Sequence, residues 1–134
     1  MKNKIVRLLM LGFVMWFVPF IVSFGFFDRS GKPNIDYDLF KSIMIVVSST
    51  VGGYAMVRYF KTTTHNFFKE ALIAGITWFV INVILDLVIL FPMAKMQLPE
   101  YFNSIGIRYL QIPIVCVAIG ALLERRSTLT TKAV

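Results

Sequence analysis

Four long apolar runs, each of about the length that crosses a membrane, dominate this sequence. They cover residues 8–27, 39–60, 67–93 and 101–123. An α-helix rises ~1.5 Å per residue, so ~20 residues cross the ~30 Å hydrocarbon layer of a bilayer. Composition agrees, because 57% of the 134 residues are hydrophobic, against ~45–50% in soluble domains. The predicted fold is all-α: one domain, 1–134, of four transmembrane helices in an up-down antiparallel bundle.

The ends of these runs are marked by polar residues. The run 8–27 follows a basic start, as a signal peptide would, but it exceeds the ~7–15 residues of a signal core. Asn66 precedes the third run as a candidate helix N-cap, and Pro99 suits the first position of a helix. The polar tail 124–134 is expected to be frayed.

Lysine and arginine are unevenly divided between the two ends of the predicted bundle. One end has only Arg29, Lys32, Lys41 and Lys95, and the other collects Lys2, Lys4, Arg7, Arg58, Lys61, Lys69, Arg125, Arg126 and Lys132. Since cytoplasmic loops carry the excess of basic residues, both termini are predicted to be cytoplasmic. The expected location is the cytoplasmic (inner) membrane of a prokaryote, with multi-pass insertion.

The stretch WFVINVILDLVILF places Asn82 and Asp86 one helical turn apart within an apolar run. A charge at the bilayer centre costs ~2.5–3.5 kcal/mol on insertion scales, so a partner is expected. Arg108, in the neighbouring fourth run, is predicted to lie at a similar depth. The two helices are joined by a short loop and must be antiparallel neighbours, which predicts a salt bridge between Asp86 and Arg108.

Further polar residues are predicted to form a buried polar seam with this pair. Ser104, Arg108 and Gln111 follow helical spacing on the fourth run, and Ser48, Ser49 and Thr50 lie at a comparable depth on the second. The seam could be structural, since interhelical hydrogen bonds join membrane helices. It could also bind an ion, a proton or a polar ligand, or face a second protomer. The candidate residues for binding or an ion pathway are Asp86, Arg108, Asn82, Gln111, Ser104, Ser48 and Ser49.

Several other features favour helix packing over chemistry. In SSTVGG, Gly52 and Gly53 predict close packing within the bundle or at a dimer seam. Pro19 and Pro113 each remove a backbone hydrogen bond and predict kinks. Aromatic residues near the span ends are interpreted as lipid or interface anchors. These are Trp16, Trp78, Tyr101 and Phe102.

Nothing in the sequence indicates catalysis or a cofactor. Cys116 is the only cysteine and His65 the only histidine, so one chain cannot assemble a protein zinc site or a bis-histidine haem site. Met93 and Met96 are too few to predict copper binding. The basic residues form no stripe that would bind nucleic acid. The expected partners are membrane lipids, a second copy in a homo-oligomer, or another membrane protein.

Three stretches of the C-terminal half resemble the corresponding half of small four-helix prokaryotic integral membrane proteins of unknown function. They are WFVINVILDLVILF, LPEYFNSIGIRYL and IPIVCVAIGALLERR. The resemblance implies four spans and brings no activity, cofactor or catalytic residue. Small multidrug transporters also have four spans, but they rely on a glutamate in the first, and the run 8–27 has no acid.

Two functions remain open on the sequence. The first is a non-enzymatic binding or structural protein in which the polar seam maintains the fold. The alternative is a small proton- or cation-coupled transporter or channel subunit that uses Asp86. In that case Asp86 would titrate, Arg108 would act as a gate, and Asn82 and Gln111 would supply selectivity dipoles.

Overall fold

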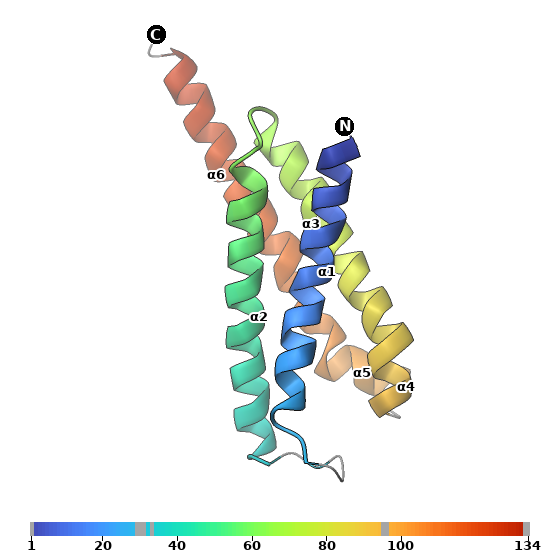
Figure 1. The fold of residues 1–134 in the computed structure, drawn as a ribbon. Coiled ribbons are helices and arrows are strands. Elements are labelled where there is room, and N and C mark those ends of the chain that lie inside the picture. Colours follow the sequence, from blue (N-terminus) through green and yellow to red (C-terminus); the bar gives the residue numbers. More distant parts are fainter. Residues whose placement is uncertain (1, 29–31, 33, 95–96, 133–134) are drawn as a thin grey trace.

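The computed structural model describes residues 2–28, 32, 34–94 and 97–132, and these residues form an all-α protein (Figure 1). The elements are α1 (Lys2–Phe24), α2 (Tyr37–Phe60), α3 (Phe67–Leu85), the π-helical turn η1 (Asp86–Leu90), α4 (Phe91–Ala94), α5 (Leu98–Ser104), the 3-10 turn η2 (Gly106–Leu110) and α6 (Gln111–Lys132). Arg29, Lys95 and Met96 lie outside the described residues.

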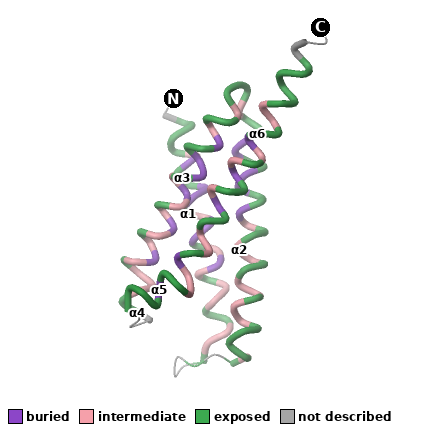
Figure 2. The backbone as a smooth tube through the Cα atoms, turned by 180° about the vertical axis from the view of Figure 1, so that it is seen from behind, coloured by how far each residue is buried: buried purple, intermediate pink, exposed green. Residues whose placement is uncertain are grey.

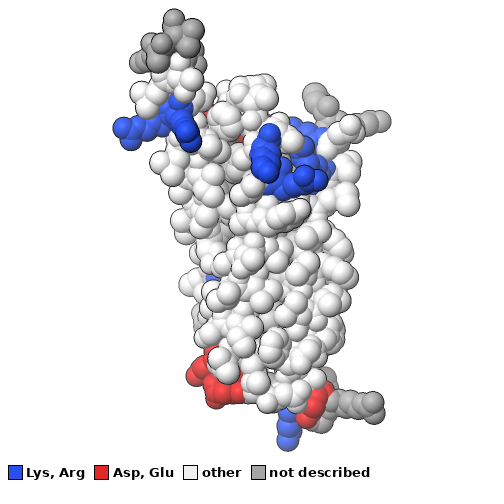
Figure 3. Space-filling model, turned by 60° about the vertical axis from the view of Figure 1, so that its left-hand side comes forward, with Lys and Arg blue, Asp and Glu red and all other residues white. Residues whose placement is uncertain are grey.

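Four helical stretches are long and apolar enough to cross a membrane. They are Asn3–Phe24, Tyr37–Phe60, Phe67–Met93 and Gly106–Thr130. The prediction of a multi-pass membrane protein built from four packed helices is confirmed at this level. Both termini lie at the same end of the bundle (Figure 1). On the face drawn in Figure 3, most lysines and arginines gather at that end and the acidic side chains at the other.

Not every pair of neighbouring helices is closely packed. α3 packs most extensively against α6, and α1 packs against both α2 and α3, whereas direct packing between α2 and α6 is slight. Buried residues of α1, α2, α3 and α6 form one hydrophobic core along the faces that these helices turn toward one another (Figure 2). α2 packs against the rest of the bundle mainly through α1.

Two glycines allow α3 and α6 to approach closely. A Cβ added to Gly75 would lie 2.8 Å from Cα of Pro113, and one added to Gly120 would collide with Ala71. Small residues at such crossings let membrane helices make extensive van der Waals contact. Cys116 is fully buried at the same interface, as expected for a small packed hydrophobe.

The fourth span differs from its prediction at both ends. Tyr101 belongs to the separate helix α5, and the chain breaks regular helix at Ile105 (φ −123°, ψ −55°) before the span begins at Gly106. Pro113 consequently lies in the first turn of α6, where proline is tolerated without a kink. The predicted frayed tail is also wrong, since α6 continues to Lys132.

The third helix begins where the sequence predicted, but without the predicted cap. Asn66 directly precedes α3 in the left-handed conformation (φ 54°), and its side chain makes no capping hydrogen bond. Asparagine tolerates this conformation better than most residues. Asn66 therefore serves the turn between α2 and α3 through its backbone.

Candidate functional site

The carboxylate of Asp86 is buried and accepts hydrogen bonds from three other segments. Nε1 of Trp16 in α1 donates to Oδ1 at 2.6 Å. The hydroxyls of Tyr101 in α5 and Tyr109 in η2 donate to Oδ2 at 3.0 Å and 2.8 Å. Because Asp86 is only 1% exposed, these neutral donors replace the water that would otherwise solvate the carboxylate.

The predicted salt bridge between Asp86 and Arg108 is wrong. Among the described residues, salt bridges join Lys4 to Glu70 and Lys41 to Asp38. The 3-10 turn η2 decides the matter, because it directs Tyr109 and not the preceding Arg108 to the carboxylate. Sequence depth was therefore a poor guide to which side chain would reach Asp86.

Irregular helical turns carry both sides of this hydrogen-bonded cluster. Asp86 begins the π-helical turn η1, in which the N–H of Phe91 donates to the carbonyl of Asp86. Tyr109 lies in the 3-10 turn η2. π-helical turns inside α-helices occur frequently at functional sites.

Tyr101 reaches Asp86 from α5, which lies between the third and fourth spans. The side chain is 1% exposed. Burial and the negative charge of the Asp86 carboxylate raise the pKa of Tyr101 above its usual value. The hydroxyl therefore stays protonated and available as a donor.

Both tryptophans are buried and bind across helices, which corrects their interpretation as interface anchors. Trp16 is 4% exposed and Trp78 is fully buried. Nε1 of Trp78 donates to the backbone carbonyl of Leu8 in α1 at 2.8 Å. A buried indole N–H needs an acceptor in hydrocarbon, and this requirement is the signal that could have identified Trp16 as a partner of Asp86. Tyr101 is buried in the same way, whereas Phe102 is exposed.

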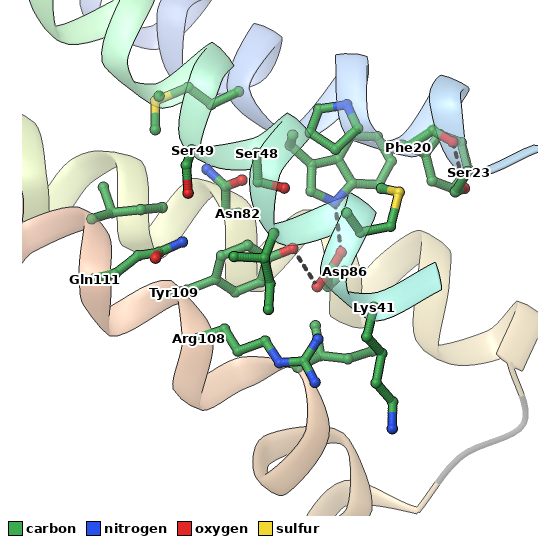
Figure 4. Close-up of a pocket in the computed structure, with 18 of the residues that line it drawn as sticks. Phe20, Ser23, Lys41, Ser48, Ser49, Asn82, Asp86, Arg108, Tyr109 and Gln111 are labelled. Atoms are coloured by element: carbon green, nitrogen blue, oxygen red, sulfur yellow. Dashed lines mark hydrogen bonds between the residues drawn. The ribbon is translucent and has the colours of Figure 1, made fainter. Parts of the chain in front are cut away.

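A cavity of about 420 Å³ opens beside this cluster, between α1, α2, η1, η2 and α6 (Figure 4). Its walls are mainly apolar and aromatic, with Phe20, Phe40 and Met44 among the lining residues. The structure brings all seven candidate binding residues to this one cavity. They are Asp86, Arg108, Asn82, Gln111, Ser104, Ser48 and Ser49.

The predicted polar seam is therefore a cavity lining and not a continuous network between helices. The hydroxyl of Ser104 donates to the carbonyl of Glu100, and the Asn82 amide donates to the carbonyl of Trp78. Thr50 likewise donates to Val46, one turn back in its own helix. Each of these side chains donates to a carbonyl of its own helix. Among the described residues of the predicted seam, Asp86 is the one whose side chain is hydrogen-bonded to other segments.

Small residues on α2 help to keep the cavity open. A Cβ added to Gly53 would meet nothing within 4 Å, and one added to Gly52 would meet only Cε of Met15, at 3.4 Å. Both glycines line the cavity together with Ser48 and Ser49. The close packing predicted within the bundle at Gly53 is absent from a single copy of the described chain, and a dimer seam there remains a prediction.

Two cations face the cavity and differ in their surroundings. Nζ of Lys41 lies 3.3 Å from Oδ1 of Asp38 and 4.1 Å from the centroid of the Tyr37 ring. Arg108 is half-buried, and its side chain has no hydrogen bond or salt bridge within the described part of the chain. In Figure 4 the side chains of Arg108 and Lys41 extend to the same side of the pocket, away from Gln111. This side of the cavity therefore carries positive charge.

The described residues contain no group of three His, Cys, Asp or Glu side chains that could hold a metal ion. His65 is exposed in the loop between α2 and α3, and its Nδ1 lies 2.9 Å from the hydroxyl of Thr64. Comparison of the chain with protein-family models, with curated proteins and with solved structures finds no match.

Proposed function

We propose that this chain is a non-enzymatic multi-pass membrane protein that binds a small lipid-soluble molecule in the cavity beside Asp86. The size of the cavity carries the proposal. At about 420 Å³ it lies within the ~300–1,000 Å³ typical of small-molecule sites. Its mainly apolar walls and few polar side chains also match the usual composition of such sites.

The route to the cavity runs through the bilayer in this proposal. α2 and α6 have little direct contact, so the space between them faces the lipid that surrounds the bundle. A molecule dissolved in the membrane can enter sideways without crossing water. We also propose the orientation with both termini in the cytoplasm, because the basic residues gather at the end that holds both termini (Figure 3).

Asp86 has a positioning role in this proposal. Its carboxylate joins α1, α5 and η2 to the end of α3 through three hydrogen bonds. Those segments form the wall of the cavity at Trp16 and Tyr109. In this proposal the Asp86 carboxylate fixes the shape of the binding site. This is the structural role that the sequence suggested for the polar residues.

The second candidate is a proton- or cation-coupled transporter or channel subunit that uses Asp86. One observation favours it: Asp86 lines the cavity and begins a π-helical turn. Against it, three donors already occupy most of the acceptor sites of the carboxylate, so a cation that needs several of these sites would have to displace Trp16 or a tyrosine. The binding function requires no such rearrangement.

Filling the cavity tests the proposal. The full chain and the variants Gly53→Phe and Val46→Phe are purified in a neutral detergent, and bound molecules are detected by native mass spectrometry. Gly53 lines the cavity with open space before it, whereas Val46 is 65% exposed on the same helix and lies outside the lining. We expect a retained molecule in the parent and in Val46→Phe, and its loss in Gly53→Phe.

Two results would overturn the proposal. One is the absence of any retained molecule from the parent chain, and the other is equal retention in Gly53→Phe. A flux assay in liposomes separates the alternative, because only a transporter or channel predicts proton or cation flux that Asp86→Asn abolishes.

A further inference from the structure

Arg108 is the feature of the cavity that the structural role of Asp86 leaves unexplained. It is half-buried, lies in a predicted membrane span and has no anionic partner among the described residues. Ionisable residues within spans usually pair with one another or with backbone carbonyls, because a lone charge is costly in hydrocarbon. Arg108 lies near the start of its span and lines the cavity, so its guanidinium is available to a bound molecule.

The charges around the cavity indicate the sign of that partner. The acidic residue in the lining is Asp86, and both of its oxygens already accept hydrogen bonds. Asp38, outside the lining, is exposed at the end of α2 and holds Lys41. A cation entering the cavity would meet Arg108, Lys41 and a carboxylate that already accepts three hydrogen bonds, whereas an anion would meet two cationic side chains on one side.

The rest of the cavity indicates the chemistry beyond the charged group. Arg108 and Lys41 lie to one side (Figure 4), and the remaining lining includes Met15, Phe20 and Ile112. An ionic side and apolar walls match a molecule with an anionic head and an apolar chain. A planar guanidinium can donate two parallel hydrogen bonds to a carboxylate or a phosphate, which suits such a head group.

We infer that the cavity binds an anionic amphiphile, with an acyl chain against the apolar walls and an oxyanion head group on Arg108. This inference rests on the proposed binding function and names its ligand class. The head group is a carboxylate, as in a fatty acid, or a phosphate, as in an anionic phospholipid. Lys41 extends to the same side (Figure 4) and would add a second attraction, weaker because Asp38 already holds its ammonium group.

Quenching of tryptophan fluorescence tests this inference, because Trp16 lines the cavity and Trp78 does not. The full chain is placed in phosphatidylcholine nanodiscs and titrated with three probes that carry the same brominated acyl chain. The probes are a fatty acid, a phosphatidylglycerol and an uncharged fatty alcohol. We expect an anionic probe to give saturable quenching at a concentration about tenfold lower than the alcohol. The probe that does so identifies the head group.

Two variants connect the effect to Arg108. Arg108→Gln is expected to remove the difference between anionic and uncharged probes, while Arg108→Lys keeps the charge and retains most of it. Arg125→Gln, which removes an exposed arginine from α6, is expected to change nothing. Circular dichroism verifies that each variant is folded. If Arg108→Gln does not fold, the inference is tested by the affinities of the anionic and uncharged probes for the parent chain and for Arg108→Lys.

The outcomes separate the inference from the proposed function. Equal affinity for the alcohol and the anionic probes overturns the inference and leaves cavity binding intact, provided that Gly53→Phe abolishes the quenching. No saturable quenching by any probe overturns the inference, whereas the proposed function is decided by the mass-spectrometry comparison of the parent chain with Gly53→Phe. Absence of quenching together with a stable dimer would assign the cavity to a second copy of the chain, and would also overturn the inference.

Discussion

Nε1 of Trp16 donates a 2.6 Å hydrogen bond to Oδ1 of Asp86, and this bond joins residues that are 70 positions apart. Indole is only a donor, so Oδ1 must be the acceptor. Trp16 is the only described donor to this oxygen, whereas Oδ2 has two tyrosines. Together with the hydrogen bond from Trp78 to the carbonyl of Leu8, this bond joins the first helix to the third membrane span.

Removing this donor is expected to destabilise the bundle. Trp16→Phe leaves Oδ1 buried without a partner, which should lower the free energy of unfolding by about 1–3 kcal/mol. Detergent-induced unfolding in bicelles, followed by circular dichroism, measures the change. Ile21→Val is the control, because this side chain of α1 is 50% exposed and should change stability by less than ~0.5 kcal/mol. A Trp16→Phe variant as stable as the control would contradict the assignment.

A pair of double-mutant cycles distinguishes the observed partners of Asp86 from the one expected by depth. Asp86→Asn combined with Tyr109→Phe should show a coupling energy of ~0.5–3 kcal/mol, since the two side chains share a hydrogen bond. Asp86→Asn combined with Arg108→Gln should show a smaller one, because the two side chains form no salt bridge. A larger coupling energy for Asp86 with Arg108 than for Asp86 with Tyr109, measured by the same unfolding assay, would show that the salt bridge is the main interaction.

Two glycine substitutions are expected to have opposite effects. Gly75→Ala places a Cβ 2.8 Å from the backbone of Pro113 and should cost about 1–3 kcal/mol, because α3 and α6 must move apart. Gly53→Ala meets open space and should stabilise α2 by ~0.5–1 kcal/mol, because alanine favours helix. The measurement is the change in unfolding free energy of each variant relative to the parent chain. If Gly75→Ala stabilises the protein as Gly53→Ala does, the α3–α6 contact is looser than described.

The orientation in the membrane can be tested by thiol labelling in intact cells. Cys116 is fully buried and should not react with a membrane-impermeant maleimide. A cysteine at Asn34, in the first loop, should be labelled from outside, whereas one at Thr64, in the second, should react only after lysis. Both positions are exposed, so burial cannot explain a difference. Labelling of Thr64→Cys alone in intact cells would reverse the proposed orientation.

Local properties of the chain explain why much of the architecture could be predicted. The length of an apolar run and the basic residues that flank it can be read one segment at a time. The bounds of the second and third spans accordingly agree with the structure, Tyr37–Phe60 and Phe67–Met93. The polar residues of the candidate site were also visible, because asparagine, aspartate and arginine stand out within apolar runs.

The fourth span was less predictable because its start depends on contacts made elsewhere. In the sequence, Tyr101 and Arg108 lie in the same apolar run. In the structure, the irregular residue Ile105 separates α5 from the membrane helix. This break lets Tyr101 turn back toward Asp86, where its hydroxyl is buried. The hydrogen bond compensates for the loss of continuous helix, and no residue pattern within 101–110 predicts that bond.

The sequence by itself determined that this protein has four apolar helices, with polar residues toward the end of the third and the start of the fourth. Run length, composition and charge placement are sufficient for that. Only the tertiary structure decided that Trp16, Tyr101 and Tyr109 hold Asp86, and that Arg108 faces the cavity without an anion. The reason is physical: a π-helical turn and a 3-10 turn rotate side chains away from regular helical positions, so spacing along the chain does not specify which polar groups meet.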